Sequence, residues 1–468
     1  MAEIKSPLAN ALIEFGNNPA IITENYQLSY SQLSNSVIHA IEKLKKLNIS
    51  AGKPVAIISE NSVEQIILLL ALWHMKIITA LISVRNPIEV MRNQIQEIDG
   101  AIIFSDKNIP IDNSKLISGI VDISNKVNTN SLLNELDSNQ DATLTFTSGS
   151  SSKPKAVLHT FGNHYYSALG SNENLPLYQN DRWLLSLPIY HVGGLGIIFR
   201  CFQVGASIVI PPYDYNLSEF IIGNNITHLS LVSTQLHRLL RGIKNKNLLS
   251  LKAILLGGSK IPLSLVKEAL DLGLPIYKSY GMTEMASQIC TTEKLNSPVK
   301  HSGKVLSYRA IKLNQNNEIL VKGETLFKGY YINGKLKRPL DSEGWFSTGD
   351  IGQFDNDDNL VVTGRIDNQF ISGGENISPE EIENIIIELY NFEKVIVVPV
   401  ADKEFGVRPV IFISGEFDKN EIVEKLNKKL PSYKIPKYFF SWPEDLTEIS
   451  IKPSRKILIQ IAEKLIDD

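Results

Sequence analysis

The sequence predicts an α/β protein with two domains, a large N-terminal one of β-sheets flanked by helices and a small α+β one at the C-terminus. Length is one reason, because 468 residues are too many for a single compact core. The other reason is that short runs of β-branched residues alternate with helical patterns between residues 53 and 280. Such alternation is typical of parallel sheets covered by helices.

The order of predicted elements changes near residue 364. Before it we expect a helix over residues 261–273, with Pro262 in the first turn and Gly273 at the end. After it the predicted elements are a helix, two strands and a second helix within about a hundred residues, the size of a small domain. The expected domains are therefore 1–364 and 365–468. The clearest strands of the large domain are 54–59, 101–105, 142–148, 182–189, 206–210, 228–232 and 252–258. The expected elements of the small domain are helices 379–390 and 419–430 and strands 395–401 and 408–414.

An apolar run over residues 66–84 is long enough to resemble a membrane span. However, His74 and Lys76 lie inside it. We therefore predict a buried helix that begins with a capping box from Ser62 to Gln65, followed by a β-rich stretch from Ile77.

Composition excludes several classes of function. Apolar residues make up 43% of the chain and charged residues 21%, and the formal net charge of -3 provides no cationic field for nucleic acid. Cys201 and Cys290 lie far apart without neighbouring ligands, so we expect neither a disulfide framework nor a zinc site. The N-terminus lacks the apolar core of a secretory signal, which favours a cytoplasmic protein. The sequence leaves open whether the chain forms a homo-oligomer.

A loop of small residues follows the strand that ends near Thr147. Backbone N–H groups and hydroxyls in such a loop can wrap phosphates, while a lysine adds a point charge. The spacing does not fit the Walker pattern, and a Ser/Gly-rich loop alone is more often a flexible linker. The residues concerned are Thr147, Ser148, Gly149, Ser150, Ser151, Ser152, Lys153, Pro154, Lys155 and Ala156.

Three further motifs follow the loop, at residues 280–284 (Tyr-Gly-Met-Thr-Glu), 347–350 (Ser-Thr-Gly-Asp) and 364–367 (Gly-Arg-Ile-Asp). Their order resembles that of the adenylate-forming enzymes, whose loop signature is Thr-Ser-Gly-Thr-Thr-Gly-x-Pro-Lys-Gly. Here Ser152 and Ala156 stand where that signature has glycines, which removes some backbone freedom. Over essentially the whole chain the sequence is most similar to the o-succinylbenzoate-CoA ligases of menaquinone biosynthesis. The stretches that carry this likeness are 186–200, 233–236, 255–259 and 284–287.

The resemblance implies ATP and Mg²⁺ as ligands of the large domain. Tyr280, next to Gly281, would stack on adenine, Thr283 would donate to the α-phosphate and Glu284 would bind magnesium. A hard carboxylate suits Mg²⁺, although Glu284 taken alone would be read as a solvated surface acid. Residues expected to approach the rest of the nucleotide are Asp350 and Arg365 at the ribose hydroxyls and Gly257, Gly258 and Ser259 along its backbone.

The resemblance also implies a mobile small domain and coenzyme A as co-substrate. Residues 364–368 match the family's hinge, with Asp367 as pivot, and Gly373 and Gly374 match the segment that lines its pantetheine tunnel. The family's Gly-Lys-x-x-Arg motif carries the adenylation lysine. Lys452 keeps the spacing to the arginine and is our choice, with Lys456 as the rival.

The acid to be activated is inferred from the region after the strand at 182–189. o-Succinylbenzoate has two carboxylates, and Arg200 is the candidate to bind the ring-borne one, the alternative being an exposed helical arginine. His191 and Ser233 would line the acyl pocket, with a positioning role for His191. We expect catalysis by Lys155, Thr283 and Lys452 with His191 beside them. The alternatives are a ligase for another aryl or medium-chain acid, or an adenylation enzyme that loads a carrier protein.

Overall fold

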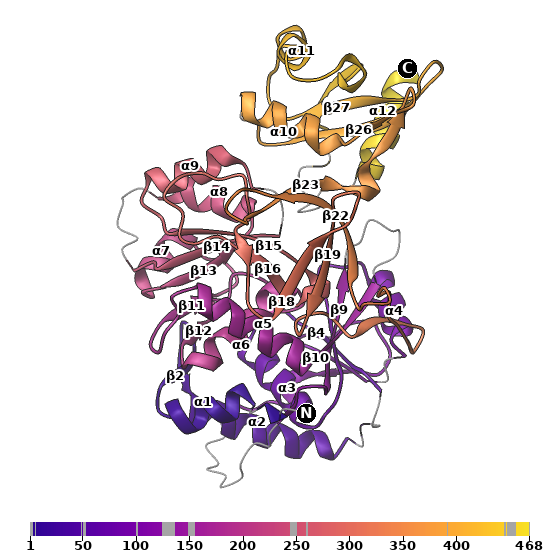
Figure 1. Ribbon diagram of the computed structural model, residues 1–468. Coiled ribbons are helices and arrows are strands. Elements are labelled where there is room, and N and C mark those ends of the chain that lie inside the picture. The colour runs from indigo at the N-terminus through magenta and orange to yellow at the C-terminus, as the bar shows by residue number, and fades with distance from the viewer. Residues whose placement is uncertain are drawn as a thin grey trace.

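The structure is a computed structural model that describes residues 3–4, 6–47, 49, 53–99, 102–123, 136–147, 155–243, 250–258, 261–390, 392–443, 446 and 455–467. Two large sheets and their helices form the lower body in Figure 1. The elements after residue 369 lie at the top of the view and join the body next to β22 (Phe346–Phe354) and β23 (Leu360–Arg365).

The eight-stranded sheet has the order β21-β20-β10-β9-β5-β4-β6-β7. Its strands from β9 to β7 are parallel, whereas β10, β20 and β21 pair antiparallel at one edge. The bounds are β4 Val55–Ile58, β5 Thr79–Ile82, β6 Ile102–Ser105, β7 Ser114–Leu116, β9 Asp141–Thr147, β10 Lys155–Thr160, β20 Gly329–Ile332 and β21 Lys335–Lys337.

The nine-stranded sheet has the order β17-β16-β15-β14-β13-β11-β12-β2-β3. The strands from β15 to β2 are parallel, and the others add antiparallel edges. The prediction of parallel sheets is therefore right for the centre of both sheets and for the β7 edge of the first, and wrong for the remaining edges, where antiparallel strands are added. The bounds are β2 Pro19–Ile22, β3 Gln27–Ser29, β11 Arg182–Leu184, β12 Ser207–Val209, β13 His228–Leu231, β14 Ala253–Leu256, β15 Ile276–Met282, β16 Ser287–Thr291 and β17 Lys304–Val305.

Helices cover these sheets, and the apolar run forms one of them. Every residue of α3 from Gln65 to Trp73 is buried, as predicted. The capping box is only half present, because Ser62 accepts from the backbone of Gln65 while the Gln65 amide donates to Ser59 O instead. Pro262 is the N-cap of α9 and does not lie in its first turn. The helices are α1 Pro7–Phe15, α2 Tyr30–Lys45, α3 Val63–His74, α4 Ile88–Glu97, α5 Phe161–Asn174, α6 Val192–Val204, α7 Leu217–Gly223, α8 Ser233–Gly242 and α9 Leu263–Asp271.

The C-terminal elements have apolar clusters of their own. One cluster lies between α10, α11 and the sheet β26-β27-β28, and a second lies between that sheet and α12. A four-stranded sheet, β18-β19-β22-β23, leads into them. The bounds are β18 Arg309–Leu313, β19 Glu318–Gly323, β24 Phe370–Ser372, β25 Glu375–Ile377, α10 Pro379–Tyr390, β26 Val395–Asp402, β27 Gly406–Ile413, α11 Lys419–Asn427, β28 Tyr438–Ser441 and α12 Arg455–Asp467.

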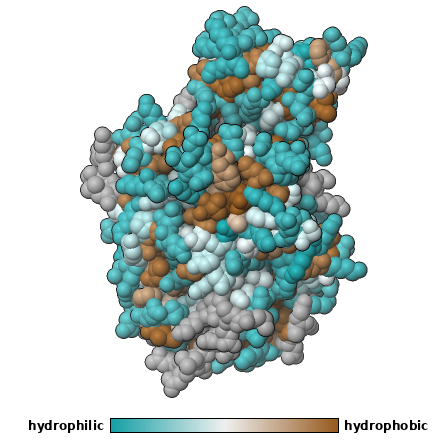
Figure 2. Space-filling view, in the orientation of Figure 1, coloured by the Kyte–Doolittle hydropathy of each residue, from teal (hydrophilic) through white to brown (hydrophobic). Residues whose placement is uncertain are grey.

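Hydrophilic side chains cover most of the face shown in Figure 2, with apolar side chains in separate patches. Among the helices that the structure describes, none combines the length and apolarity needed to cross a membrane. Cys201 and Cys290 are buried free thiols.

Candidate active site

Four candidate residues of the large domain lie at the carboxyl ends of neighbouring strands of the nine-stranded sheet. Strands β11, β13, β14 and β15 are neighbours and parallel, so their carboxyl ends meet at one edge of the sheet. His191 ends the loop after β11, Ser233 begins α8 directly after β13, Gly257 follows β14, and Tyr280 lies near the end of β15. This edge is where open α/β sheets bind their ligands.

Glycines at this edge are needed for close backbone approach. A Cβ atom on Gly257 would lie 2.7 Å from the Ser279 hydroxyl oxygen, and Gly258 has a φ of +80°. A Cβ on Gly281 would collide with the carbonyl oxygen of Ser287 on the neighbouring strand. Ser259, which the sequence places next to these glycines, lies outside the described residues.

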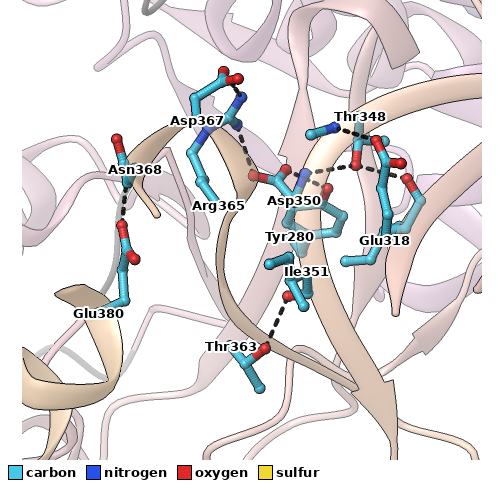
Figure 3. A network of polar contacts seen from close by, with 12 residues as sticks. Tyr280, Glu318, Thr348, Asp350, Ile351, Thr363, Arg365, Asp367, Asn368 and Glu380 are labelled. Atoms are coloured by element: carbon cyan, nitrogen blue, oxygen red, sulfur yellow. Dashed lines mark hydrogen bonds and ion pairs between the residues drawn. The ribbon is translucent and has the colours of Figure 1, made fainter. Parts of the chain in front are cut away.

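A polar cluster joins β15 to the β22–β23 hairpin (Figure 3). The Tyr280 hydroxyl donates to one oxygen of Asp350 at 2.6 Å, and Arg365 Nη1 donates to the other at 2.6 Å. Burial, and then the nearby Asp350 charge, raise the pKa of Tyr280 well above its usual range, so the phenol stays a donor. The structure thus brings together three residues that the sequence separates by up to 85 positions.

The turn that carries Asp350 is held by Thr348 of the same motif and by two residues that the sequence motifs did not single out, Glu318 and Ile319. Thr348 Oγ1 accepts from the Asp350 backbone N–H at 3.0 Å and donates to Ile319 O at 2.7 Å. The carboxylate of Glu318 accepts from the N–H of Gly349 at 3.1 Å (Figure 3). These bonds fix the turn that presents Asp350.

The predicted phosphate loop is bracketed by a strand pair. Thr147, the last residue of β9, faces Lys155, the first residue of β10, across the antiparallel ladder. The Lys155 ammonium lies 4.9 Å from the centre of the Tyr330 ring on β20. The loop residues between Thr147 and Lys155, 148–154, lie outside the described residues.

Thr283 and Glu284 lie in a short 3-10 helix, Thr283–Met285, directly after β15. Glu284 is 8% exposed, so its reading as a solvated surface acid is wrong. Its carboxylate accepts from the Tyr330 hydroxyl at 2.8 Å, and its backbone carbonyl accepts from Phe327 N at 2.7 Å. The carboxylate has no cationic side chain within ion-pair distance among the described residues.

A carboxylate of this kind fits magnesium. Within the described part of the chain, no group of three or more His, Cys, Asp or Glu side chains could enclose a metal ion. A single buried carboxylate is nevertheless the usual protein share for Mg²⁺, which keeps waters and bridges substrate phosphates. Glu284 would therefore hold the ion together with the nucleotide.

Two buried histidines, His159 and His164, lie next to Thr283, and His159 contacts its backbone. His159 on β10 contacts the Thr283 carbonyl oxygen through Nε2 at 2.7 Å. Burial lowers the pKa of His159 to about 4, so at neutral pH its ring is uncharged. The ring of His164 lies 4.9 Å away, and its pKa is also lowered, first by burial and then by His159.

Arg200 is buried in α6 with 1% of its surface exposed, so the alternative of an exposed helical arginine is wrong. It donates to the Gln288 side-chain oxygen at 2.8 Å and lies 5.3 Å from the Trp183 ring centre. Nε and Nη1 are buried and have no hydrogen-bond partner among the described residues. Burial lowers the pKa of Arg200 to about 10, which still leaves a cation at neutral pH.

His191 lies at the N-terminus of the same helix. It is exposed, and its ring packs edge-on to Tyr190 with 4.8 Å between ring centres. The loop before it is fixed by Asn61, which donates to Leu187 O at 2.9 Å and accepts from Ile189 N at 2.9 Å. His191 is thus the N-cap of α6, and Arg200 lies in the second half of the same helix.

In the C-terminal part, Gly373 and Gly374 have φ angles of +59° and +89°. A Cβ on Gly373 would meet the Phe405 ring at 2.7 Å, whereas one on Gly374 would meet nothing within 4 Å. Lys452 lies outside the described residues. Its motif partner Arg455 is firmly placed, because it donates to Glu380 at 3.0 Å and to Glu383 at 2.6 Å on α10.

Comparison with known proteins identifies the family of this chain. The family model of AMP-binding enzymes matches residues 9–331. A 2-succinylbenzoate--CoA ligase of Bacillus cereus is 31% identical over 462 residues, covering 95% of this chain and 96% of the relative.

Solved structures agree. The o-succinylbenzoate CoA synthetase of Bacillus subtilis in complex with the acyl-adenylate intermediate OSB-AMP has a TM-score of 0.87 at 27% identity and covers 98% of both chains. The same synthetase in complex with ATP and magnesium ion has a TM-score of 0.84 at 28% identity and covers 94% of this chain and 96% of that one. The chain belongs to the AMP-binding enzyme family and, within it, to the 2-succinylbenzoate-CoA ligases.

Proposed function

We propose that this chain ligates 2-succinylbenzoate (o-succinylbenzoate) to coenzyme A through an acyl-AMP, with release of AMP and pyrophosphate, as a step of menaquinone biosynthesis. ATP, Mg²⁺ and CoA are its other ligands. Membership of the ligase family supports the reaction type. One observation supports the choice of acid, namely the state of Arg200.

Arg200 is a buried cation with unused donors. Two of its three guanidinium nitrogens have no partner among the described residues, and its described hydrogen-bond acceptors, Gln288 and Ser287, are neutral. Arg309, another buried arginine, differs from Arg200 because its guanidinium nitrogens donate to the backbone carbonyls of Ser167, Gln288 and Ser307. A buried charge without a counter-ion is unfavourable unless a ligand supplies one. The ring carboxylate of 2-succinylbenzoate would supply it as a bidentate acceptor.

In the first half-reaction the succinyl carboxylate, already ionised at neutral pH, attacks the α-phosphorus of ATP in line and pyrophosphate leaves. Tyr280, Asp350 and Arg365 hold the adenosine. Magnesium on Glu284 would neutralise charge that develops on the phosphates. Thr283 donates to the α-phosphate, while Lys155 and Lys452 add positive charge near the leaving group and the attacking oxygen. No covalent bond to the enzyme is needed.

In the second half-reaction the CoA thiol attacks the acyl carbon and AMP leaves. The open space beside Gly374 suits a thin pantetheine arm. Residues 365–468 form a small domain that rotates about the segment at 365–368, with Asp367 as pivot, so that its two faces serve the two half-reactions. The buried free thiols suit a cytoplasmic location.

Mass spectrometry of the product formed from 2-succinylbenzoate, ATP and CoA tests the proposal. The expected product is the CoA thioester of 2-succinylbenzoate, with one AMP and one pyrophosphate released for each thioester. A panel of benzoate and medium-chain acids is run in parallel, together with a phosphopantetheinyl carrier protein in place of CoA. Faster turnover of a monocarboxylic acid or of the carrier protein would overturn it.

A further inference from the structure

Tyr330 lies between two residues proposed to act on the phosphates, Glu284 and Lys155. Its hydroxyl donates to Glu284 Oε1 at 2.8 Å, and its ring lies under the Lys155 ammonium at 4.9 Å. We propose that Tyr330 is a positioning residue that sets the magnesium-binding carboxylate and the phosphate-loop lysine relative to each other. This inference rests on the proposed function, because both groups act on Mg²⁺-ATP.

The ring is held rigidly enough for that role. Tyr330 is 8% exposed and pairs with Val157 across the β10–β20 ladder, two residues beyond Lys155. It belongs to the same apolar cluster as Met285, the neighbour of Glu284. Phe327 packs edge-on against it, with 4.9 Å between ring centres. The ring therefore joins the strand that carries the lysine to the segment that carries the carboxylate.

The hydroxyl acts on the carboxylate. Because it donates to one oxygen of Glu284, it fixes the orientation of the group and leaves the second oxygen for the metal ion. Groups that orient a metal ligand in this way commonly contribute 10- to 100-fold to metal affinity. The contribution should be clear for Mg²⁺, which requires nearly ideal octahedral geometry.

The ring face acts on the lysine. Lys155 is exposed and its long side chain has many rotamers, so placing its charge on a phosphate requires ordering. An ammonium within about 6 Å of an aromatic ring centre is attracted to the ring face. Tyr330 thus limits the positions of the Lys155 charge before nucleotide arrives.

Two substitutions separate these effects. Tyr330→Phe keeps the ring and removes the hydroxyl, whereas Tyr330→Leu removes both. Tyr331→Phe is the matched control, because Tyr331 is next on β20 and packs against the apolar cluster on the other side of the sheet. Binding of α,β-methylene-ATP, which cannot release pyrophosphate, is measured by calorimetry with and without Mg²⁺.

We expect Mg²⁺ to raise the affinity of the wild type for α,β-methylene-ATP. In Tyr330→Phe this gain in affinity should be about tenfold smaller, while the affinity for the analogue without Mg²⁺ stays unchanged. Tyr330→Leu should also weaken metal-free binding, and Tyr331→Phe should match the wild type. An equal Mg²⁺ response in Tyr330→Phe and wild type would overturn the inference.

A double-substitution cycle separates orientation from a loss of folding. In a Glu284→Gln background, Tyr330→Phe should leave the Mg²⁺ response unchanged, because the carboxylate that it orients is already gone. A further loss there would also overturn the inference. Thioester formation by the wild type is measured first. Its failure would reject the proposed substrate, whereas a wild-type Mg²⁺ response in Tyr330→Phe would reject only the role of Tyr330.

Discussion

The guanidinium of Arg200 and the side-chain oxygen of Gln288 lie 2.8 Å apart, so this buried cation is oriented by a neutral amide. An amide fixes the direction of the guanidinium without neutralising its positive charge. The full charge stays available to an acidic ligand, as discrimination between one and two carboxylates requires.

Substitution of Arg200 should act on one substrate only. Arg200→Ala should raise the KM for 2-succinylbenzoate by an amount equivalent to about 2 to 5 kcal/mol and leave the KM for ATP nearly unchanged. Arg200→Lys should restore only part of the loss, because an ammonium lacks the planar fork. Steady-state kinetics with each substrate varied in turn measure both effects.

An analogue without the ring carboxylate provides the control. It should be a poor substrate of the wild type and should lose little more in Arg200→Ala, because the missing interaction is the same one. Equal use of the analogue and 2-succinylbenzoate by the wild type would contradict the role of Arg200.

The adenylation lysine is predicted from spacing alone. Lys452→Ala should slow acyl-AMP formation by on the order of a hundredfold or more, while thioester formation from supplied acyl-AMP changes much less. Lys456→Ala is the matched control, since Lys456 is an exposed residue of α12, whereas Leu458 and Ala462 form the buried face of that helix. Single-turnover assays of each half-reaction decide between the two lysines, and a selective adenylation defect in Lys456→Ala would reverse the assignment.

A bulky residue at Gly374 should block only the second half-reaction. Gly374→Leu places its side chain in the open space expected for pantetheine, so pyrophosphate release in the first turnover should persist while thioester formation stops. Gly415→Leu controls for backbone strain, because Gly415 also has a positive φ of +85° and open space around it. Equal loss of both half-reactions in Gly374→Leu, or the same defect in Gly415→Leu, would contradict the tunnel role.

Buried His159 should make the fold sensitive to acid. The unfolded chain binds a proton at this side chain near pH 6.5, whereas the folded protein binds it only near pH 4. The unfolded state therefore holds more protons between these values, and stability falls as pH decreases from 6.5 toward 4. His159→Gln, which can still donate to the Thr283 carbonyl, should lose less stability over this range. Urea unfolding at several pH values measures the difference, and identical pH profiles for both proteins would contradict it.

Local patterns predicted the elements well. Helix α10 (Pro379–Tyr390) has the bounds read from the sequence, six of the seven predicted strands of the large domain contain an observed one, and the seventh, 142–148, overlaps β9 with a shift of one residue. These elements were predicted from the spacing of apolar and β-branched residues over short stretches of the chain. The antiparallel edges were missed, because the pairing of β20 with β10 joins segments about 170 residues apart and leaves no local signal.

The same reason explains what was missed in the site. Tyr280, Glu284 and Asp350 belong to short motifs and could be found from the sequence. Tyr330, Gln288 and His159 act through contacts with distant segments. The one available signal was the polar tip of Tyr330 within a run otherwise suited to a buried strand, since a buried phenol usually has a hydrogen-bond partner.

Two anchors flank the segment about which we propose that the small domain turns. On one side, the ion pair of Arg365 with Asp350 holds the chain to the large body, and on the other side Asn368 donates to Glu380 at 2.5 Å (Figure 3). Glu380 also accepts from Arg455 of α12. In the proposed rotation, Asn368 would move together with α10 and α12. The change in backbone dihedral angles would then fall on Ile366 and Asp367, so a proline at either position, which fixes φ, should hinder the change from one half-reaction to the other.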